Sequence, residues 1–493
     1  MRIQNIEMLT SHGNIEGRKI IAELLDVGLD SLDPYYNVKK LVKLVDNKIV
    51  IDNKDYELPG DPRSGPAIYD LNDYDRVFVV GAAKGVGRAA VAFEEVLGDA
   101  LTGGHVIGKH GDPIECKKIG VTLAGHPTPD DFCVEGCEKI AEIAKDITKR
   151  DLVFTITGSG CGSLMTFPSE GITLQEVTDF TYMMQIEKGV PTGDLNIIRT
   201  HIDRMKGGRI TRMFLPATLV HMTVADPAKT TIPGVRVTYQ EMLKKNTFFP
   251  QLSADSSYSD AIDRIYKWDA WERTPQSIRN HLLNGTVETE NMRYDEYESI
   301  GSRFFGLIFK NATVYPSVIN RSKELGYECV MLSEFMSAEA VEAAKVVSSI
   351  ALNIEVLEQP IKPPVILMTS GEILVTVGNE TGVGGRNQEY CLSAALNIAG
   401  NKRIVIGAVD TDGTDGPGGL NIPNAPSCLA GAIVDGYTVK EANEKGINIA
   451  EALKKHDTSK PLWELGCGVD AINGVSALDL GLILINNDNK RKE

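Results

Sequence analysis

The chain has 493 residues, of which 42% are hydrophobic and 24% are charged, a composition that is typical of folded globular proteins and excludes the disordered and fibrous classes. Lys and Arg number 51 against 67 Asp and Glu, and the net charge of −16 disfavours a broad surface for nucleic acid or for an anionic membrane. A chain of this length is expected to form two or three domains.

The cysteines and the first residues indicate a cytoplasmic location. The eight cysteines are sparse and form no C-x-x-C pair, so we expect reduced thiols. Residues 1–19 contain Glu7, His12 and Glu16 where a secretory signal needs an apolar run, and the chain has no apolar run of about 18 residues. We therefore expect neither export nor a membrane span.

The first predicted elements are a helix over 17–27, ended by Gly28, and a polar hairpin over 48–57. A strand over 76–80 then leads through the glycine-rich turn 81–87 into a helix over 88–97. This order is repeated by strands over 118–123 and 151–157 and by a helix over 132–145. Such alternation predicts a Rossmann-like parallel sheet that helices cover on both faces.

The alternation stops between residues 240 and 305, where tryptophans and tyrosines crowd into an acidic segment, and we interpret this segment as an insertion. It resumes with a helix that ends at Leu325 and with further strands and helices up to residue 409. We therefore expect two α/β domains with mainly parallel sheets. The predicted domains are residues 1–305, which include the insertion, and residues 306–493.

The turn from Gly81 to Gly87 follows an apolar strand and opens a helix, so its backbone N–H groups are placed to receive a phosphate. Lys84 within this turn is placed to contact a transferring phosphoryl group. A tight strand-to-helix turn without a ligand is the alternative. A nicotinamide dinucleotide site is the weakest interpretation, because no acidic residue stands about 20 residues further on and no Tyr-x-x-x-Lys pair follows.

A second glycine-rich turn follows the strand over 151–157. Its bare backbone favours oxyanion binding, and it matches neither a nucleophile elbow nor a Walker A loop. A Cys161 nucleophile with His126 as its base is a minor alternative. The candidate anion-binding residues of this turn are Gly158, Ser159, Gly160, Gly162 and Ser163.

Cations follow in the segment from Asn196 to Gly208. Arg199 and Lys206 are seven residues apart, which predicts one face of a single helix ended by glycines. In so acidic a protein, cations beside glycine-rich turns favour an anionic ligand over a solvated surface.

Two further segments carry chemistry in the second half. Arg386 follows three glycines and begins an apolar helix, where its fork of donors suits a phosphate or a carboxylate. Asp410, Asp412 and Asp415 follow the strand that ends at Val409. Their spacing differs from a calcium loop, whereas Mg²⁺ held by one or two carboxylates and by substrate phosphates is the natural use, with a plain Asp- and Gly-rich turn as the alternative.

In this order, the motifs resemble those of the glycerate 2-kinase family of the MOFRL type. The resemblance covers the lysine-bearing turn, His126 to Asp130, the second glycine turn with Pro168 to Leu174, and Asn196 to Gly208. In the second half it covers Gly384 to Glu389 and Thr411 to Pro417, continued by Ala430 to Gly436.

This resemblance implies a two-domain enzyme with its active site in the interdomain cleft, which transfers the γ-phosphoryl group of ATP, with Mg²⁺, to a small hydroxy acid. D-glycerate is the expected acceptor and 2-phosphoglycerate the product. A homodimer is possible. The expected catalytic residues are Lys84, Arg386 and Asp412, and Asp410 and Asp415 are the expected metal ligands. Substrate or phosphate binding is expected from Gly81, His126, Gly158, Ser159, Gly160, Gly162, Ser163, Asn196, Arg199, Lys206, Asn387 and Glu389.

Two segments depart from the family pattern, residues 224–234 and residues 466–474. Two alternatives therefore stay beside the kinase. One is a divergent relative that catalyses another transfer or an isomerisation on an anionic metabolite, and the other is a metabolite-binding protein without catalysis.

Overall fold

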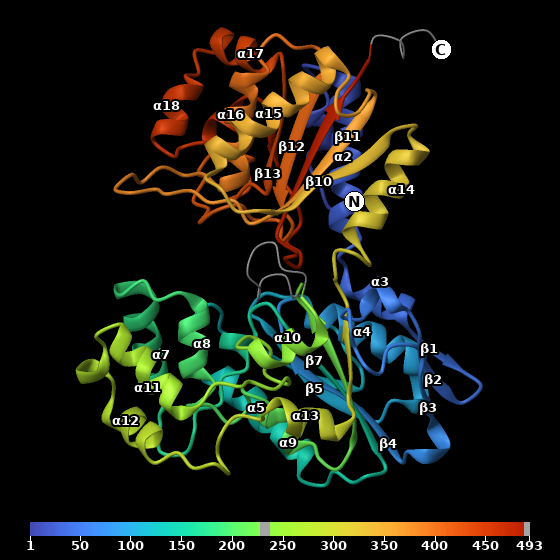
Figure 1. The fold of residues 1–493 in the computed structure, drawn as a ribbon, viewed down its shortest axis with the longest axis vertical. Helices are drawn as coiled ribbons and strands as arrows, with labels where there is room; N and C mark the ends of the chain where they lie inside the picture. Colours follow the sequence, from blue (N-terminus) through green and yellow to red (C-terminus); the bar gives the residue numbers. More distant parts are fainter. Residues whose placement is uncertain (227–236, 488–493) are drawn as a thin grey trace. The chain divides into compact units, whose positions relative to one another are not determined.

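The computed structural model describes residues 1–226 and 237–487; part of the departing segment 224–234 therefore lies outside the described residues. The chain divides into two compact units, which are described separately (Figure 1). One, the parallel-sheet unit, is Asp33–Phe309, and the other, the mixed-sheet unit, combines Met1–Leu32 with Lys310–Glu493. The first 32 residues thus pack with the C-terminal half and not with the N-terminal domain, where they were expected.

The parallel-sheet unit is built on six strands in the order β6-β5-β4-β7-β8-β9, with every neighbouring pair parallel. In chain order this is 3-2-1-4-5-6, the arrangement of a Rossmann fold, so the predicted fold class is confirmed. The order reverses between β4 and β7, where such sheets bind ligands. The strands are β4 (Arg76–Ala82), β5 (Gly103–Lys109), β6 (Ile119–Ala124), β7 (Asp151–Gly158), β8 (Thr218–Val224) and β9 (Arg303–Gly306).

Two of the helices between these strands, α4 and α5, match the helices predicted over 88–97 and 132–145. The side chain of Asp130 accepts a hydrogen bond from the Cys133 amide and caps α5. The helices are α3 (Pro34–Leu41), α4 (Val86–Leu97), α5 (Asp131–Ala144), α6 (Cys161–Leu164), α7 (Leu174–Tyr182), the π-helix η4 (Met183–Glu187), α8 (Thr192–Arg199) and α9 (Arg209–Met213). A separate antiparallel sheet contains β1 (Val42–Val45), β2 (Lys48–Ile51) and β3 (Ala67–Asp70).

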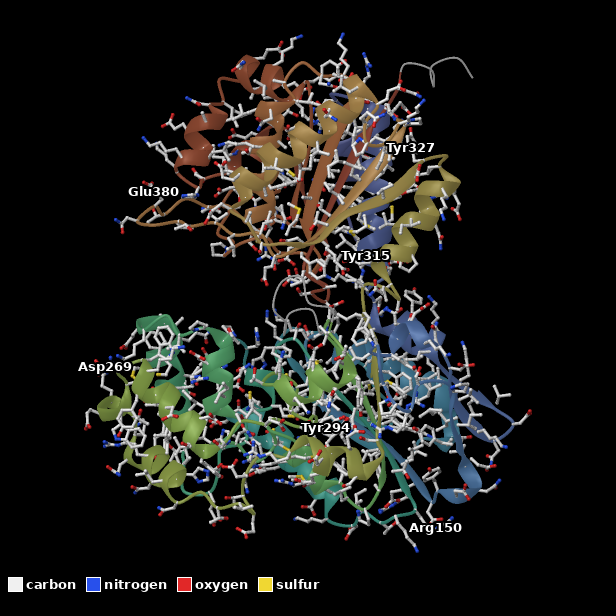
Figure 2. All side chains as sticks on the ribbon, viewed as in Figure 1. Arg150, Asp269, Tyr294, Tyr315, Tyr327 and Glu380 are labelled. Atoms are coloured by element: carbon white, nitrogen blue, oxygen red, sulfur yellow. The ribbon has the colours of Figure 1, made fainter. Side chains whose placement is uncertain are left out.

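The expected insertion is helical. Capping boxes start α10 at Thr238 and α11 at Ser257, and Tyr294, labelled in Figure 2, begins α13. Apolar residues of α11 and α12 form one hydrophobic cluster with those of α7, η4 and α8. The helices are α10 (Tyr239–Lys245), α11 (Tyr258–Lys267), the 3₁₀ helix η6 (Trp271–Arg273), α12 (Gln276–Leu283) and α13 (Tyr294–Ile300).

The sheet of the mixed-sheet unit has the order β10-β11-β15-β12-β13-β14. Only the β10–β11 pair is parallel among the described strands of this sheet, so the expectation of mainly parallel sheets is wrong for this unit. The reason is that β15, the last strand, inserts between β11 and β12 and runs antiparallel to both. The strands are β10 (Glu328–Met336), β11 (Val365–Gly371), β12 (Ile404–Asp410), β13 (Gly431–Asp435), β14 (Gly468–Val469) and β15 (Asp479–Ile485).

Helices cover both faces of this sheet. Ile404 and Ile406 point to the cluster of α15 and α16, whereas Gly407 faces α2, as the alternation of a strand requires. The helices are α1 (Ile6–Leu9), α2 (Ile15–Asp30), α14 (Val314–Glu324), α15 (Ala340–Leu357), α16 (Arg386–Asn397), α17 (Thr438–Glu444), α18 (Ile449–Lys454) and α19 (Ser459–Glu464). None of the helices that the described residues form is long and apolar enough to cross a membrane.

Helix α2 explains why the N-terminus belongs to this unit, and Figure 1 shows it in blue among the orange and red elements. Arg18 is fully buried and its Nε donates to a carboxylate oxygen of Asp435 at 2.5 Å. The helix continues through Gly28 instead of ending there, because this glycine lies against Leu480, whose Cδ2 would stand 2.5 Å from an added Cβ. Gly28 therefore serves close packing rather than termination.

Candidate functional site

The two glycine turns of the parallel-sheet unit lie side by side, after β4 and β7, where the strand order reverses. The Lys84 amide donates to the Ser159 carbonyl at 2.7 Å. Gly81 has a φ of 157°, and a Cβ there would stand 1.8 Å from the Ile156 carbonyl oxygen, so only glycine fits between the strands. The structure thus brings together the two turns that the sequence analysis singled out.

Lys84 and His126 meet over Gly160. A Cβ on Gly160 would lie 3.1 Å from His126 Cδ2 and 3.2 Å from Lys84 Cγ, and its φ of +85° favours glycine as well. Both side chains are half-buried. Within residues 1–226 and 237–487, no hydrogen bond or ion pair reaches the Lys84 ammonium group or the His126 ring. Two polar groups therefore face the turn with capacity for a ligand.

Burial, together with the positive charges of Lys84 and Lys109, lowers the pKa of His126 to about 4. The ring is therefore neutral at pH 7 and has one donor and one acceptor nitrogen. A neutral ring beside Lys84 adds no charge but can bind a hydroxyl or a phosphate oxygen.

The hydroxyl and thiol groups of the second turn differ in their availability. The Ser159 hydroxyl is buried without a hydrogen-bond partner among the described residues, whereas the Ser163 hydroxyl donates to the Gly125 carbonyl at 2.9 Å. Cys161 is buried, its Sγ lies 3.4 Å from the Phe248 carbonyl oxygen, and burial raises the pKa of its thiol to about 12. The protonated thiol does not support the alternative of a Cys161 nucleophile.

The cationic segment is not one helix. Helix α8 ends at Arg199, because the Thr200 hydroxyl and His201 Nδ1 both bond to the Ile197 carbonyl, at 2.9 and 2.8 Å. The expected shared helical face of Arg199 and Lys206 is therefore wrong.

Lys206 and Arg199 also differ in their partners. The Lys206 ammonium group is buried, pairs with Asp203 and donates to the Met165 carbonyl at 2.7 Å. Arg199 is half-buried, and its guanidinium makes one long bond of 3.4 Å, to Asn196 Oδ1. Of these two cations, Arg199 is the one with donors left for a ligand.

In the mixed-sheet unit, Arg386 begins α16 and is surrounded by carboxylates. Its Nε donates to Asp479 at 2.9 and 3.0 Å, its Nη2 donates to Asp410 at 2.8 Å, and Glu372 lies 3.6 Å from Nη1. These charges hold the pKa of Arg386 above its usual range despite its burial. The guanidinium is thus rigidly placed at the start of a helix.

The three aspartates after β12 have different roles. Both carboxylate oxygens of Asp415 accept hydrogen bonds from the start of α16, from the Asn387 amide at 3.1 Å and the Gln388 amide at 2.9 Å. Asp410 bonds to Arg386 and accepts from the Asp412 amide at 3.1 Å. Asp412 accepts two bonds from Thr414, both on Oδ1. Within the described ranges, no group of three or more His, Cys, Asp or Glu residues could hold a metal ion by itself, so the role of Asp410 and Asp415 as metal ligands stays a prediction.

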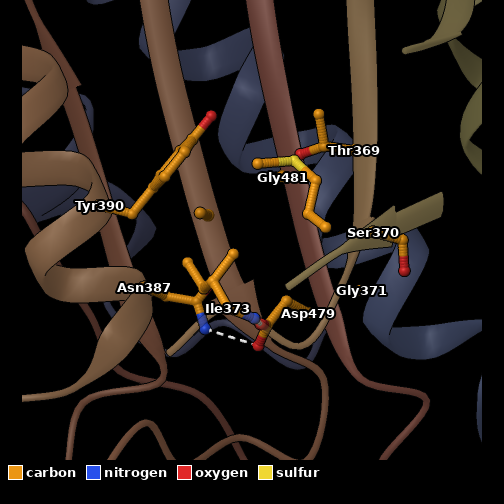
Figure 3. A pocket seen from close by; sticks show the side chains of 10 residues that line it. Thr369, Ser370, Gly371, Ile373, Asn387, Tyr390, Asp479 and Gly481 are labelled. Carbon is orange, nitrogen blue, oxygen red and sulfur yellow. Dashed lines mark hydrogen bonds between the residues drawn. The ribbon is translucent and has the colours of Figure 1, made fainter. Parts of the chain in front are cut away.

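Asp479 is the residue that sequence reasoning missed. It starts β15, and Asn387 Nδ2 donates to it at 2.8 Å beside a small pocket that Tyr390 also lines (Figure 3). Burial raises its pKa. In the sequence, Asp479 is recognisable only as an acidic residue ahead of an apolar run. It lies beside Asp410 because β15 runs antiparallel to β12.

The chain is similar to known proteins over most of its length. The domain of unknown function DUF4147 matches residues 20–283, and the MOFRL family matches residues 365–474. The D-glycerate 2-kinase of Thermotoga maritima is 30% identical over 419 residues, which cover 83% of this chain and 91% of that protein. The chain belongs to the glycerate 2-kinase family.

Two other matches agree. The glycerate 2-kinase of Pyrococcus horikoshii is 29% identical over 91% of this chain and 92% of its own length. The crystal structure of glycerate kinase from Thermotoga maritima matches with a TM-score of 0.74 and 25% identity, covering 95% of this chain and 99% of that one. The predicted family is confirmed, and this glycerate 2-kinase family member is a phosphotransferase with a hydroxyl group as its acceptor.

Proposed function

We propose that this glycerate 2-kinase family member transfers the γ-phosphoryl group of ATP to the C2 hydroxyl of D-glycerate. The observation that carries the proposal is the meeting of Lys84, His126 and the Ser159 turn at the point where the strand order reverses. These groups offer a positive charge, a neutral ring and an unpartnered hydroxyl on a bare backbone. Phosphoryl transfer needs this combination of positioning and charge neutralisation.

In this proposal Lys84 is the catalytic cation of the parallel-sheet unit. Its ammonium group has no carboxylate partner among the described residues, so its charge is available to the equatorial oxygens of the transferring group. The Ser159 amide already donates to the Val224 carbonyl, so the N–H groups that follow it in the turn, together with the Ser159 hydroxyl, bind further oxygens.

Arg386 is the proposed second catalytic cation. Asp479 and Asp410 orient its guanidinium, and Asn387 supports Asp479 in turn. These groups act as positioning residues: they engage Nε and Nη2 of Arg386, so Nη1, which lies 3.6 Å from Glu372, is the nitrogen left to donate to a phosphate oxygen.

Mg²⁺ would bind chiefly through nucleotide phosphates and would neutralise their developing charge. Two observations support Asp412 as its ligand: among the described residues the side-chain bonds to Asp412 fall on Oδ1, whereas Asp415 accepts from backbone N–H groups through both oxygens. We therefore propose Asp412, rather than Asp410 or Asp415, as the protein ligand.

Glu389 belongs to the support of this helix start. Its carboxylate bonds to His456 Nδ1 at 2.7 Å, and burial raises its pKa. We propose that it positions α16 and does not contact the substrate.

The test is ADP release from ATP and Mg²⁺ across a panel of hydroxy acids: glycerate, erythronate, threonate, tartrate and hydroxypyruvate. The proposal expects release with D-glycerate and loss of release in Lys84→Ala. ADP release with a larger acid alone would show that this acid, and not D-glycerate, is the acceptor. Binding of an acid without ADP release would favour the non-catalytic alternative, and a change in the acid without ADP would favour the divergent relative.

A further inference from the structure

A pocket lies beside the second glycine turn, on the side of α7 and α8. Gly162 of the turn, Val177 and Thr181 of α7, and Arg199 at the end of α8 contribute to its wall. A Cβ on Gly162 would lie 3.7 Å from Arg199 Nη1. The guanidinium therefore lies at van der Waals distance from the turn at Gly162.

The charge of Arg199 is unmatched in this pocket. Its one recorded hydrogen bond is the 3.4 Å contact with Asn196, and no ion pair reaches it within the described ranges. Burial lowers the pKa of Arg199 to about 10. A guanidinium removed from water without a carboxylate partner favours binding of an anion.

The other charged groups of the pocket are already engaged. Asp203 accepts hydrogen bonds from the amides of Phe167 and Met205, at 3.0 and 2.8 Å, and pairs with Lys206. This arrangement neutralises the Asp203 carboxylate, so it does not substitute for a ligand on Arg199. Because Lys206 is paired with Asp203, it does not bind the same anion as Arg199.

We propose that Arg199 binds the carboxylate of the acceptor and that Val177 and Thr181 limit the acceptor's length. This inference rests on the proposed function and deepens it. Lys84 lies at Gly160 and Arg199 at Gly162, on one turn. An acceptor that sets its carboxylate on Arg199 therefore directs its hydroxyl group along the turn towards Lys84. A fork of N–H donors matches a carboxylate in two parallel bonds.

The helices of the insertion pack against α7 and α8, which line this pocket. Val177 and Ile198 share a hydrophobic cluster with Tyr258, Ala261 and Ile265 of α11. At the other end of α8, Asp194 pairs with Arg264 at 3.0 Å and with Lys267 at 2.7 Å. The insertion therefore fixes the helix that carries Arg199.

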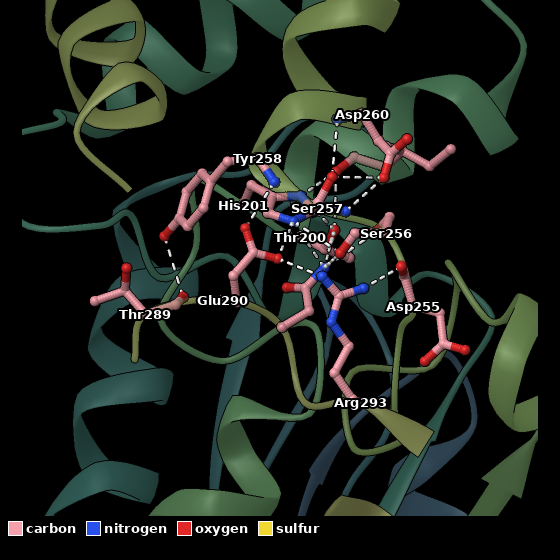
Figure 4. A network of polar contacts seen from close by, with 12 residues as sticks. Thr200, His201, Asp255, Ser256, Ser257, Tyr258, Asp260, Thr289, Glu290 and Arg293 are labelled. Carbon is pink, nitrogen blue, oxygen red and sulfur yellow. Dashed lines mark hydrogen bonds and ion pairs between the residues drawn. The ribbon is translucent and has the colours of Figure 1, made fainter. Parts of the chain in front are cut away.

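Figure 4 shows the network of polar contacts around His201, which lies just after α8. His201 Nδ1 lies 2.8 Å from the Ile197 carbonyl oxygen, and its Nε2 lies 3.1 Å from Asn291 Nδ2 and 3.2 Å from the Ser256 carbonyl oxygen. Burial lowers the pKa of His201, so the ring is neutral and donates from one of its two nitrogens. The turn directly after Arg199 is thus held by Asn291, which follows α12.

The experiment is calorimetric binding of D-glycerate, glycerol and ATP·Mg²⁺ to the wild type, Arg199→Gln and Arg199→Lys. The control is Arg204→Gln, because Arg204 is exposed and lies over the Phe167 ring, 3.5 Å from its centroid. We expect the glycerate Kd to rise at least about 30-fold in Arg199→Gln, less in Arg199→Lys, and not in the control. Glycerol, which lacks the carboxylate, should bind wild type and Arg199→Gln alike, and ATP·Mg²⁺ affinity should not change.

An unchanged glycerate Kd in Arg199→Gln, or a loss confined to ATP·Mg²⁺, would overturn the inference. Failure of the proposed function is a different result, in which wild type binds glycerate through Arg199 but never consumes ATP. Conversely, glycerate turnover that Arg199→Gln leaves intact would overturn the inference and leave the kinase assignment standing.

A second variant tests the length limit without removing a charge. Val177→Ala enlarges the pocket, and Val190→Ala removes the same two methyl groups from the same cluster at a residue that does not line the pocket. We expect the ratio of kcat/KM for erythronate over glycerate to rise about 10-fold in Val177→Ala and to stay constant in Val190→Ala. Equal ratios in both variants would overturn the length assignment.

Discussion

The Lys84 amide donates a hydrogen bond of 2.7 Å to the carbonyl of Ser159. This bond joins the turn after β4 to the turn after β7, on the two strands between which the order of the sheet reverses. The lysine is therefore fixed against the glycine-rich backbone by its own main chain, while its side chain stays free of ion pairs among the described residues. The ammonium group is therefore available to an anionic ligand.

Replacement of Lys84 by alanine is expected to lower kcat about 10²- to 10³-fold, because the charge acts on the transferring group. Thermal stability should change little, since the side chain makes no ion pair in the described structure. The control is Lys139→Ala, which removes an exposed ammonium group paired with Glu135 on α5. Equal rates in Lys84→Ala and wild type would remove Lys84 from the mechanism.

The loop aspartates give a prediction that separates metal binding from helix capping. Asp415→Ala should lower the free energy of unfolding by about 1–3 kcal/mol, because it leaves the Asn387 and Gln388 amides without acceptors. Asp412→Ala should raise the Mg²⁺ concentration needed for half-maximal rate and leave stability nearly unchanged. Denaturant titration and rate measurements against Mg²⁺ check the pair. If Asp415→Ala instead changed the Mg²⁺ dependence and Asp412→Ala lowered the stability, Asp415 would be the metal ligand.

Lys206 is expected to behave as a structural residue. Lys206→Met leaves Asp203 buried without its partner, and removal of one member of a buried pair costs about 3–5 kcal/mol. Urea unfolding should show this loss, whereas Arg204→Gln should unfold as the wild type does. A stable Lys206→Met protein with a raised KM for substrate would instead show that the ammonium group binds ligand.

Acid should destabilise the parallel-sheet unit through His221, which is fully buried on β8. Burial lowers its pKa from 6.5 to about 3, so the unfolded chain binds the additional proton between these values, and stability falls as pH falls below about 6.5. The loss attributable to this ring is about 2 kcal/mol at pH 5. His221→Gln should therefore show a shallower decline of the unfolding free energy between pH 7 and pH 5. An identical slope in both proteins would contradict the assignment.

Local patterns predicted β4, β6 and β7 of the parallel-sheet unit and the helices α4 and α5, because in these segments strand, turn and helix follow one another in the sequence. They did not predict β5, β8 and β9, and the helical insertion separates β9 from β8. The turns at Lys84 and Ser159 were found from their glycines, and the fold brings them together at the reversal of strand order as such sheets require. The mixed sheet was predicted poorly. The direction of β15 depends on pairing with residues at least 69 positions away in the sequence, and hydrophobic patterning carries no information on direction.

The same limit applies within the site. The sequence identified Arg386 and the three aspartates but not Asp479, which reaches Arg386 only through that antiparallel strand. It also grouped Arg199 with Lys206 by helical spacing, whereas side-chain bonds from Thr200 and His201 end the helix between them. The charges in the sequence do not show that Lys206 forms an ion pair with Asp203 while Arg199 does not.

The most direct test of the central claim is the identity of the product formed from D-glycerate and ATP·Mg²⁺. Phosphorus NMR, or coupling to enolase, which consumes 2-phosphoglycerate, distinguishes the two phosphoglycerates. The account predicts stoichiometric ADP and 2-phosphoglycerate with the wild type and neither with Lys84→Ala. ATP left unconsumed by a folded wild-type protein that binds D-glycerate would contradict it.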